Sequence, residues 1–254
     1  MRTKVLLDKK IGQTPLEAID AWKAHHSRYA DVPASYAGRL DPMASGKLLI
    51  LLGDECKKQK EYTGLDKTYE IEVLLDVGSD TGDILGIIEG NEESTTITKK
   101  KILEIIKAEL GTHTVPYPIY SSKTVAGKPL FLYALEGTLG TIEIPMHEET
   151  IYSIRYRGTY SLSTARLERR ITSLLALAPT SIEPSKALGA DFRIEKVRES
   201  WSRVFAHERS YPVLKLRVAC GSGTYMRSLA MRIGKALGTR ALALSIRRTK
   251  IKGV

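Results

Sequence analysis

The chain has 254 residues, of which 43% are hydrophobic, and this is enough for one large folded domain. No apolar run approaches the ~18 residues that a membrane-spanning helix needs, and no signal peptide is recognisable, so we expect a cytoplasmic protein without membrane contact. The net charge of +10 indicates a polyanionic partner and favours RNA or DNA over a membrane surface.

The cysteines and histidines give no metal pattern. Cys56 and Cys220 are far apart and form no CxxC pair, and the five histidines contain no HExxH spacing. We therefore expect free thiols and no metal site.

The N-terminal half predicts short strands and helices. The first helix has Thr14 as N-cap, Pro15 at its first position and Glu17 completing a capping box, and it extends to about His26. The other elements expected here are strands over 4–8, 48–52 and 69–77, a helix over 53–62, and a segment over 84–88 that pairs with the third strand across the turn at 78–82.

The C-terminal half continues the mixture. Helices are expected from 98 to 110, with Thr98 as N-cap and Gly111 as the stop, and from 224 to 237, where Gly238 ends the apolar face. The remaining elements are a loop over 115–129 and strands over 151–157, 213–219 and 241–246.

The segment over about 158–210 has the character of an insertion between two strands, with helices expected over 164–177 and 191–205. Strands and helices alternate irregularly along the chain, without a repeat or a clear linker. This pattern favours one α+β domain built on a mixed sheet.

The segment 37–49 is a turn-rich loop that runs into a buried strand. Asp41 precedes Pro42, which biases Asp41 away from helix, and Gly38 and Gly46 permit tight backbone paths on either side. A carboxylate held in this way suits a nucleophile, a general base or a plain turn-forming aspartate, and the spacing does not choose among them.

The run Gly-Arg-Leu-Asp-Pro-Met-Ala-Ser-Gly at 38–46 resembles the active-site motif of pseudouridine synthases, closest to the TruB type that modifies the tRNA T-loop. Further matching segments follow in the family's order: Asp8-Lys9 with Gly12 and Thr14, Lys67-Thr68-Tyr69, Asp80-Thr81-Gly82-Asp83 with Gly86, Tyr120-Ser121 with Gly127-Lys128-Pro129-Leu130, and Gly223 to Leu229 with Gly238 and Arg247-Arg248. The resemblance covers most of residues 4–250 except about 158–210.

The resemblance implies a pseudouridine-synthase fold, an α+β arrangement with a mixed, largely antiparallel sheet flanked by helices. It implies one catalytic domain over 1–254, without the C-terminal PUA domain of many bacterial members. The catalytic residues that it implies are Asp41, Tyr69 and Arg227. The RNA-binding residues that it implies are Tyr36, Arg39, Lys67, Tyr120, Lys123, Lys128 and Tyr225. The expected partner is RNA, with the tRNA T-arm first, bound by a monomer.

Two departures from the TruB pattern keep alternatives open. Tyr36 stands where the family usually has histidine, and Arg39 replaces a small residue. The Gly-Arg-Leu-Asp form also resembles the sister families that modify ribosomal RNA. The alternatives are therefore a ribosomal-RNA pseudouridine synthase and an RNA-binding or tRNA-folding protein with secondary catalysis.

The chemistry explains these residue types. Pseudouridine formation breaks a glycosidic N–C bond and rejoins the same base through carbon, so no cofactor or energy source is expected. An ionised Asp41 would attack the sugar or the base or deprotonate the sugar, and Arg227 would orient it through a bidentate ion pair. Tyr69 would stack on the flipped base and shuttle a proton.

The inserted segment suggests an RNA clamp. Its arginines recur at helical spacing, namely Arg166, Arg169 and Arg170 on the first expected helix and Arg193, Arg198 and Arg203 on the second. The alternative is that they pair with Glu168, Glu195 and Glu199 on a solvated face.

Overall fold

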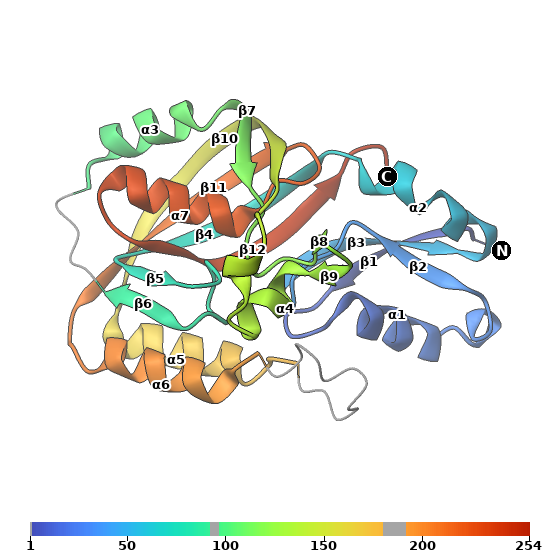
Figure 1. Cartoon of the computed structure of the whole chain (residues 1–254), viewed down its shortest axis with the longest axis horizontal. Coiled ribbons are helices and arrows are strands. Elements are labelled where there is room, and N and C mark those ends of the chain that lie inside the picture. Colours follow the sequence, from blue (N-terminus) through green and yellow to red (C-terminus); the bar gives the residue numbers. More distant parts are fainter. Residues whose placement is uncertain (1, 92–96, 180–191) are drawn as a thin grey trace.

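The computed structural model describes residues 2–91, 97–179 and 192–254, and its centre is an eight-stranded sheet (Figure 1). The order is β1-β3-β12-β4-β11-β10-β7, with β2 also paired to β3. These strands are β1 (Lys4–Lys9), β2 (Ala34–Ala37), β3 (Ala44–Leu52), β4 (Lys67–Leu75), β7 (Gly111–Pro116), β10 (Met146–Ser163), β11 (Ser210–Cys220) and β12 (Ala241–Ile251). Only β3 and β12 pair in parallel within this sheet, which confirms the predicted mixed, largely antiparallel α+β fold.

Helices cover both faces of the sheet (Figure 1). The α-helices are α1 (Pro15–Ala24), α2 (Gln59–Thr63), α3 (Lys99–Ala108), α4 (Leu130–Leu135), α5 (Thr164–Leu175), α6 (Ile194–Phe205) and α7 (Met226–Leu237). Along β4, Ile71 and Val73 pack into the core that α1, α3 and α7 share, whereas Leu74 packs into the core of α5 and α6. In the part of the chain that the structure describes, no helix is long and apolar enough to span a bilayer.

Local sequence signals fix several helix ends as predicted. The Thr14 hydroxyl accepts from the Glu17 backbone N–H and the Glu17 carboxylate accepts from the Thr14 N–H, so the capping box of α1 is confirmed. Thr98 caps α3 by accepting from the Lys101 N–H. Gly238 ends α7 with a φ of 84°, a left-handed conformation that glycine adopts at low cost.

Three predictions in the first half differ from the structure. The strand expected up to Val77 stops at Leu75 because Asp76 has a φ of 70°, and β5 (Val77–Ser79) then pairs with β6 (Ile88–Asn91) in a separate two-stranded sheet. Within segment 84–88, Ile88 does pair across the turn, but with Ser79 of β5 and not with β4, and Ile84 is buried in the α5–α6 core. The helix expected over 53–62 is a 3-10 helix over Gly53–Lys58 followed by the short α2.

The second half differs mainly in the length of its strands. Pairing of β10 with β11 continues to Ser163 opposite Ser210, so both strands enter the segment expected to be inserted, and α5 and α6 lie beyond their ends. The start expected for the second helix, Asp191, lies outside the described residues. The loop expected over 115–129 contains a short hairpin of β8 (Thr124–Val125) and β9 (Lys128–Pro129).

Candidate active site

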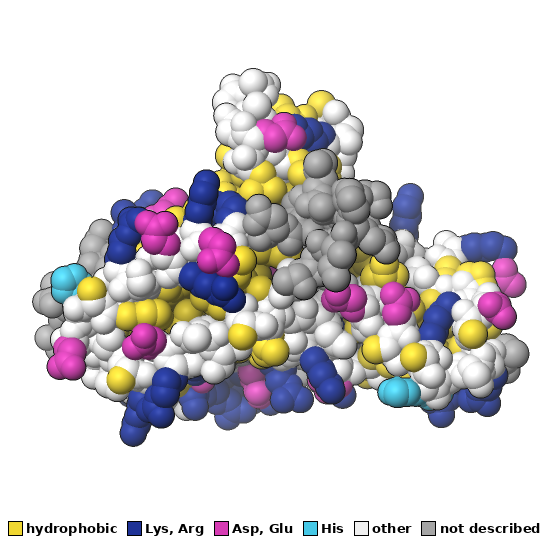
Figure 2. Space-filling model, turned by 90° about the horizontal axis from the view of Figure 1, so that it is seen from below, with side chains coloured by type: hydrophobic (Ala, Val, Ile, Leu, Met, Phe, Trp, Pro, Cys, Tyr) yellow, Lys and Arg dark blue, Asp and Glu magenta, His cyan; other side chains and the backbone are white. Residues whose placement is uncertain are grey.

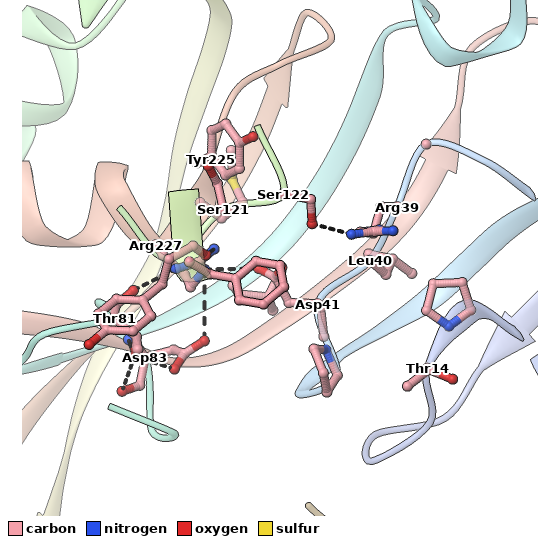
Figure 3. A pocket seen from close by; sticks show the side chains of 18 of the residues that line it. Thr14, Arg39, Leu40, Asp41, Thr81, Asp83, Ser121, Ser122, Tyr225 and Arg227 are labelled. Carbon is pink, nitrogen blue, oxygen red and sulfur yellow. Dashed lines mark hydrogen bonds and ion pairs between the residues drawn. The ribbon is translucent and has the colours of Figure 1, made fainter. Parts of the chain in front are cut away.

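A pocket of about 1090 Å³ gathers residues from most of the length of the chain (Figure 3). Asp41, Tyr69 and Arg227 all line it, although they belong to the β2–β3 loop, β4 and α7. Of the residues expected to contact RNA, those in the pocket lining are Tyr36, Arg39, Lys67, Tyr120, Lys123 and Tyr225. Lys128 is not in the lining.

Asp41 lies in a tight turn that the neighbouring backbone holds. Its carbonyl accepts from the Ala44 N–H at 3.0 Å, and the Pro42 carbonyl accepts from the Gly12 N–H at 3.0 Å. The carboxylate is 36% exposed and its Oδ2 accepts from Nε of Arg227 at 2.8 Å. Asp41 is therefore both a turn-forming aspartate and a member of a charged site.

Arg227 is buried in the first turn of α7, and all of its nitrogens have acceptors (Figure 3). Nη1 donates to the Thr81 carbonyl at 2.7 Å and Nη2 to the Tyr120 carbonyl at 3.1 Å. The predicted bidentate ion pair is thus wrong, because a buried guanidinium must satisfy its remaining N–H groups and here carbonyls do so. This three-point attachment fixes the plane of the guanidinium beside Asp41.

Asp83 adds a second, buried carboxylate, with Oδ2 at 3.8 Å from Nε of Arg227. Burial raises the pKa of Asp83, and the Arg227 charge opposes that shift. For Arg227, burial acts to lower the pKa, but the charges of Asp41 and Asp83 raise it overall, so the guanidinium stays charged. Asp83 lies in the 80–83 motif but was not among the expected site residues.

Two further buried cations hold the loop that carries Asp41. Nζ of Lys9 donates to the carbonyls of Pro42, Gln13 and Lys10 at 3.1, 2.6 and 2.9 Å. Arg248 donates to three carbonyls of the 38–47 segment, namely those of Gly38, Arg39 and Lys47. Both side chains are 1% exposed. Both side chains fix the loop by donating hydrogen bonds to its backbone carbonyls.

Gly46 shows why this packing needs glycine. Its φ is 101°, and a Cβ there would lie 2.2 Å from the Arg248 carbonyl oxygen. Any side chain would separate β3 from β12, and the Asp41 loop ends immediately before that pair. The glycine therefore supports the position of the candidate catalytic carboxylate.

Lys67 and Tyr69 lie on the inward face of β4. Nζ of Lys67 donates to the Thr63 carbonyl at 2.7 Å and to the Ser222 hydroxyl at 3.3 Å. Burial, reinforced by the Arg248 charge, lowers the pKa of Lys67 to about 8. Burial raises the pKa of Tyr69, whose ring is 8% exposed, so its phenol stays protonated at neutral pH.

The alternation of inward- and outward-facing residues along β1 and β12 could have indicated the two buried cations, Lys9 and Arg248. Val5, Leu7 and Lys9 share one side of β1, and Ile246 and Arg248 share one side of β12, so each inward row ends in a cation. Such a cation at the end of a buried row must find carbonyls or a ligand, because burying an unpaired charge is costly. The alternation was visible in the sequence, but the role of the two cations in holding the loop depended on where the strand ends meet in the fold.

Aromatic side chains form one wall of the pocket. Tyr117 stacks on His147 with ring centres 4.0 Å apart, and Tyr225 meets Tyr117 edge-on at 6.3 Å. Nζ of Lys123 lies 4.9 Å from the Tyr117 ring centre. Tyr117 and Tyr225 both line the pocket, so they offer ring faces and edges to a planar ligand.

The remaining residues expected to contact RNA differ in where their side chains lie and in the partners that they contact. The Arg39 guanidinium donates to the Tyr36 hydroxyl at 2.9 Å and to the Ser122 hydroxyl, at the exposed rim of the pocket. Lys128, by contrast, pairs with Glu136 and lies 4.5 Å from the Tyr133 ring centre. Its side chain is therefore engaged with α4 and its surroundings.

The chain matches a known protein family. Residues 29–172, more than half of the chain, match the family described as TruB family pseudouridylate synthase (N terminal domain). The chain belongs to the TruB family. The family resemblance seen in the 38–46 motif is confirmed.

Curated relatives match the TruB-family chain over nearly all of its length. The tRNA pseudouridine synthase B of Nitrosospira multiformis is 32% identical over 254 residues, covering 98% of this chain and 64% of the relative. The tRNA pseudouridine synthase B of Caldicellulosiruptor saccharolyticus is 28% identical over 246 residues, covering 97% and 66%. The chain therefore spans just under two thirds of the length of these relatives.

Solved structures share the TruB-family fold. The crystal structure of a Cbf5-Nop10-Gar1 complex contains a chain that matches with a TM-score of 0.56 and 18% identity, over 98% of this chain and 48% of that one. A chain in the structure of an H/ACA RNP bound to a substrate RNA containing 2′-deoxyuridine matches with a TM-score of 0.51 and 18% identity, over 98% and 47%. At this identity the likeness concerns the fold.

The arginines of the TruB-family chain's helical segment are largely paired. Arg170 contacts Glu72 on β4 and donates to the Tyr160 hydroxyl at 2.8 Å. The other ion pairs are Arg193–Asp80, Arg198–Glu195 and Arg203–Glu199. Figure 2 views the side of the molecule on which α1, α5 and α6 lie, and basic and acidic side chains are interspersed there. The alternative, in which the arginines pair with acidic neighbours, therefore holds for Arg198 and Arg203, and Arg166 and Arg169 are the exposed candidates for RNA contact.

Proposed function

We propose that this chain isomerises uridine to pseudouridine in tRNA, at the T-loop uridine of position 55. The observation that carries the proposal is the Asp41–Arg227 pair, held beside Tyr69 in a pocket large enough for an extruded nucleotide. The names of the curated relatives, tRNA pseudouridine synthase B, support tRNA as the substrate class. We also propose that the described elements act as one catalytic domain that binds RNA as a monomer.

Asp41 starts the reaction in this proposal. Arg227 orients its carboxylate, so that it promotes cleavage of the N1–C1′ bond of the flipped uridine. The freed uracil turns within the pocket, C5 bonds to C1′, and the proton lost from C5 balances the one gained by N1. The protonated Tyr69 hydroxyl is a donor beside this path, and its ring supports the base.

In this proposal, residues at the rim and walls of the pocket recognise the RNA. Arg39 and Lys123 provide cations for phosphates, and Tyr36, Tyr117 and Tyr225 provide rings for unstacked bases. Single-stranded or loop RNA suits such a site better than a duplex, because a paired base is out of reach unless it leaves the stack. A tRNA loop satisfies this requirement.

The test is direct mapping of pseudouridine after treating unmodified tRNA and ribosomal RNA with the purified protein. The proposal requires modification at the T-loop uridine of tRNA by the wild type and none by Asp41→Asn. Modification confined to ribosomal RNA would favour the alternative that Arg39 raises. Pseudouridine in neither RNA would overturn the proposed activity.

A further inference from the structure

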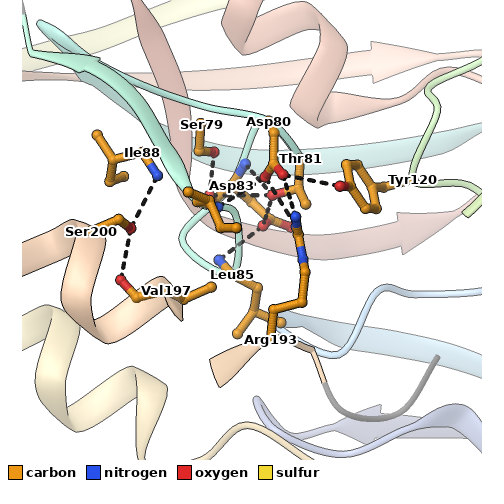
Figure 4. Close-up of polar contacts among 11 residues, drawn as sticks. Ser79, Asp80, Thr81, Asp83, Leu85, Ile88, Tyr120, Arg193, Val197 and Ser200 are labelled. Atoms are coloured by element: carbon orange, nitrogen blue, oxygen red, sulfur yellow. Dashed lines mark hydrogen bonds and ion pairs between the residues drawn. The ribbon is translucent and has the colours of Figure 1, made fainter. Parts of the chain in front are cut away.

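Tyr120 connects the active-site ion pair to a second polar cluster through both of its ends, and Figure 4 shows the end at which its hydroxyl meets Asp80. Its backbone carbonyl accepts from Nη2 of Arg227 at 3.1 Å. Its hydroxyl donates to Oδ2 of Asp80 at 3.0 Å. A shift of Tyr120 would therefore remove one of the three acceptors that orient Arg227.

Arg193, at the start of α6, holds the outer end of this connection. Its Nη1 and Nη2 lie 2.5 and 3.1 Å from Oδ2 and Oδ1 of Asp80, a two-point ion pair. Its guanidinium also lies 4.6 Å from the ring centre of Tyr120, within the range of a cation–π contact. The side chains of Arg193 and Asp80 are only 18% and 14% exposed, so solvent screens the pair weakly.

Asp80 is itself fixed to its own loop. Its Oδ1 accepts from the Ile87 N–H at 2.9 Å, and Thr81, the next residue, supplies the second carbonyl that binds Arg227. Two of the three Arg227 acceptors, the Thr81 and Tyr120 carbonyls, thus belong to segments that meet at Asp80. Arg193 ties both segments to α6.

Local preferences do not explain the conformation of Arg193. It is the N-cap of α6 with φ 51° and ψ 36°, a left-handed conformation that a non-glycine residue adopts at a cost. Its positive charge also lies near the positive end of the helix dipole, where anions are preferred. The contacts with Asp80 and Tyr120 offset both effects, so the tertiary arrangement holds this residue.

We propose that Arg193 is a positioning residue: by clamping Asp80 and Tyr120 it fixes the carbonyls that orient Arg227 toward Asp41. The inference rests on the proposed function and deepens it, because it assigns the α5–α6 segment a part in catalysis as well as any part in RNA binding. Arg193 acts through Asp80, Tyr120 and Arg227 in turn. Its loss should slow the chemical step and leave RNA affinity nearly unchanged.

The experiment compares Arg193→Gln with Arg198→Gln. Arg198 lies on the same helix, is exposed and pairs locally with Glu195, so it is a matched control for charge and helix context. At saturating tRNA, Arg193→Gln should lower the single-turnover rate about tenfold or more and change the RNA dissociation constant less than about threefold. Arg193→Lys should recover part of the rate, and Arg198→Gln should behave as wild type.

Hydrogen exchange provides a readout that does not depend on activity. Backbone amides around Tyr120 should exchange faster in Arg193→Gln than in the wild type or Arg198→Gln. Tyr120→Phe, which removes only the hydroxyl that meets Asp80, is the second variant. It should also lower the single-turnover rate and speed the exchange of backbone amides around Tyr120.

Each outcome decides the proposal. A normal single-turnover rate in folded Arg193→Gln, a loss confined to RNA affinity, or unchanged exchange around Tyr120 would overturn it. An equal loss in Arg198→Gln would do the same. If the wild type forms no pseudouridine, the proposed function fails by itself, and the exchange comparison still supports or overturns the clamp.

Discussion

Nε of Arg227 donates to Oδ2 of Asp41 at 2.8 Å, although 186 positions separate the two residues in the chain. The carboxylate belongs to a loop that Lys9 and Arg248 hold through carbonyls, and the arginine belongs to a helix end that Thr81 and Tyr120 hold in the same way. Both partners are therefore fixed before any substrate enters, as electrostatic preorganisation requires.

Asp41→Asn should abolish pseudouridine formation while changing RNA affinity by no more than several-fold. Asn keeps the shape of the side chain but loses the charge that the proposed reaction uses. Single-turnover assays and equilibrium RNA binding measure the two effects. Asp54→Asn, an exposed acid paired with Lys57, is the control and should retain full activity. Turnover near the wild-type rate in the Asp41 variant would remove the catalytic assignment.

Tyr69→Phe should bind RNA normally and stall afterwards. The ring that supports the base remains, and the buried hydroxyl beside Arg248 is removed. Trapped or slowly released RNA in gel-shift assays, together with a lower single-turnover rate, would show this. Tyr152→Phe, an exposed tyrosine on β10, is the matched control. Normal turnover in Tyr69→Phe would leave the ring with a stacking role only.

Lys67 should make stability rise with pH in the alkaline range. Its pKa is about 8 in the folded protein and 10.5 ordinarily, so between these values the unfolded chain binds the proton more tightly. The free energy of unfolding of the wild type minus that of Lys67→Met should therefore increase with pH from about 8 to 10.5, by at most about 1.4 kcal/mol per pH unit. Denaturant titrations at several pH values measure this difference.

The same comparison with Lys60→Met, an exposed lysine on α2, should show no such trend. Lys9 also has a pKa lowered to about 8 by burial, but it is present in every variant and cancels in the difference. A flat difference for Lys67→Met would mean that this lysine keeps its ordinary pKa.

Arg170→Gln should lower the free energy of unfolding by about 1–3 kcal/mol, since it leaves the half-buried Glu72 without its arginine. This pair joins α5 to the sheet at β4, so the effect is structural. Arg166→Gln, on the exposed side of the same helix, should change stability by less than about 0.5 kcal/mol. Chemical denaturation of both variants tests the contrast, and equal stabilities would contradict it.

Arg166 and Arg169 remain candidates for phosphate binding on α5. Changing both to Gln should weaken RNA binding and make its salt dependence shallower by roughly 0.7–0.9 for each phosphate that the protein no longer neutralises. Arg203→Gln is the control, because it pairs with Glu199 on the exposed surface of α6. An unchanged slope in the double variant would assign α5 to structure alone.

Features that depend on neighbours along the chain were predictable from the sequence. The Thr14–Glu17 capping box, the Gly238 helix stop and the alternation in β4 were predictable because each involves residues within a few positions. The 38–46 motif identified the family, and with it the expectation of a paired Asp41 and Arg227.

The contacts that hold the site in place depend on tertiary packing. Lys9, Arg248 and Arg193 are hydrophilic residues whose partners lie up to 210 positions away, and their burial depends on which strand ends and helix ends converge. The single rather than bidentate contact of Arg227 follows from the two carbonyls that share its guanidinium. No local pattern specifies such acceptors, because every residue carries a carbonyl and only packing selects the ones that a buried cation must use.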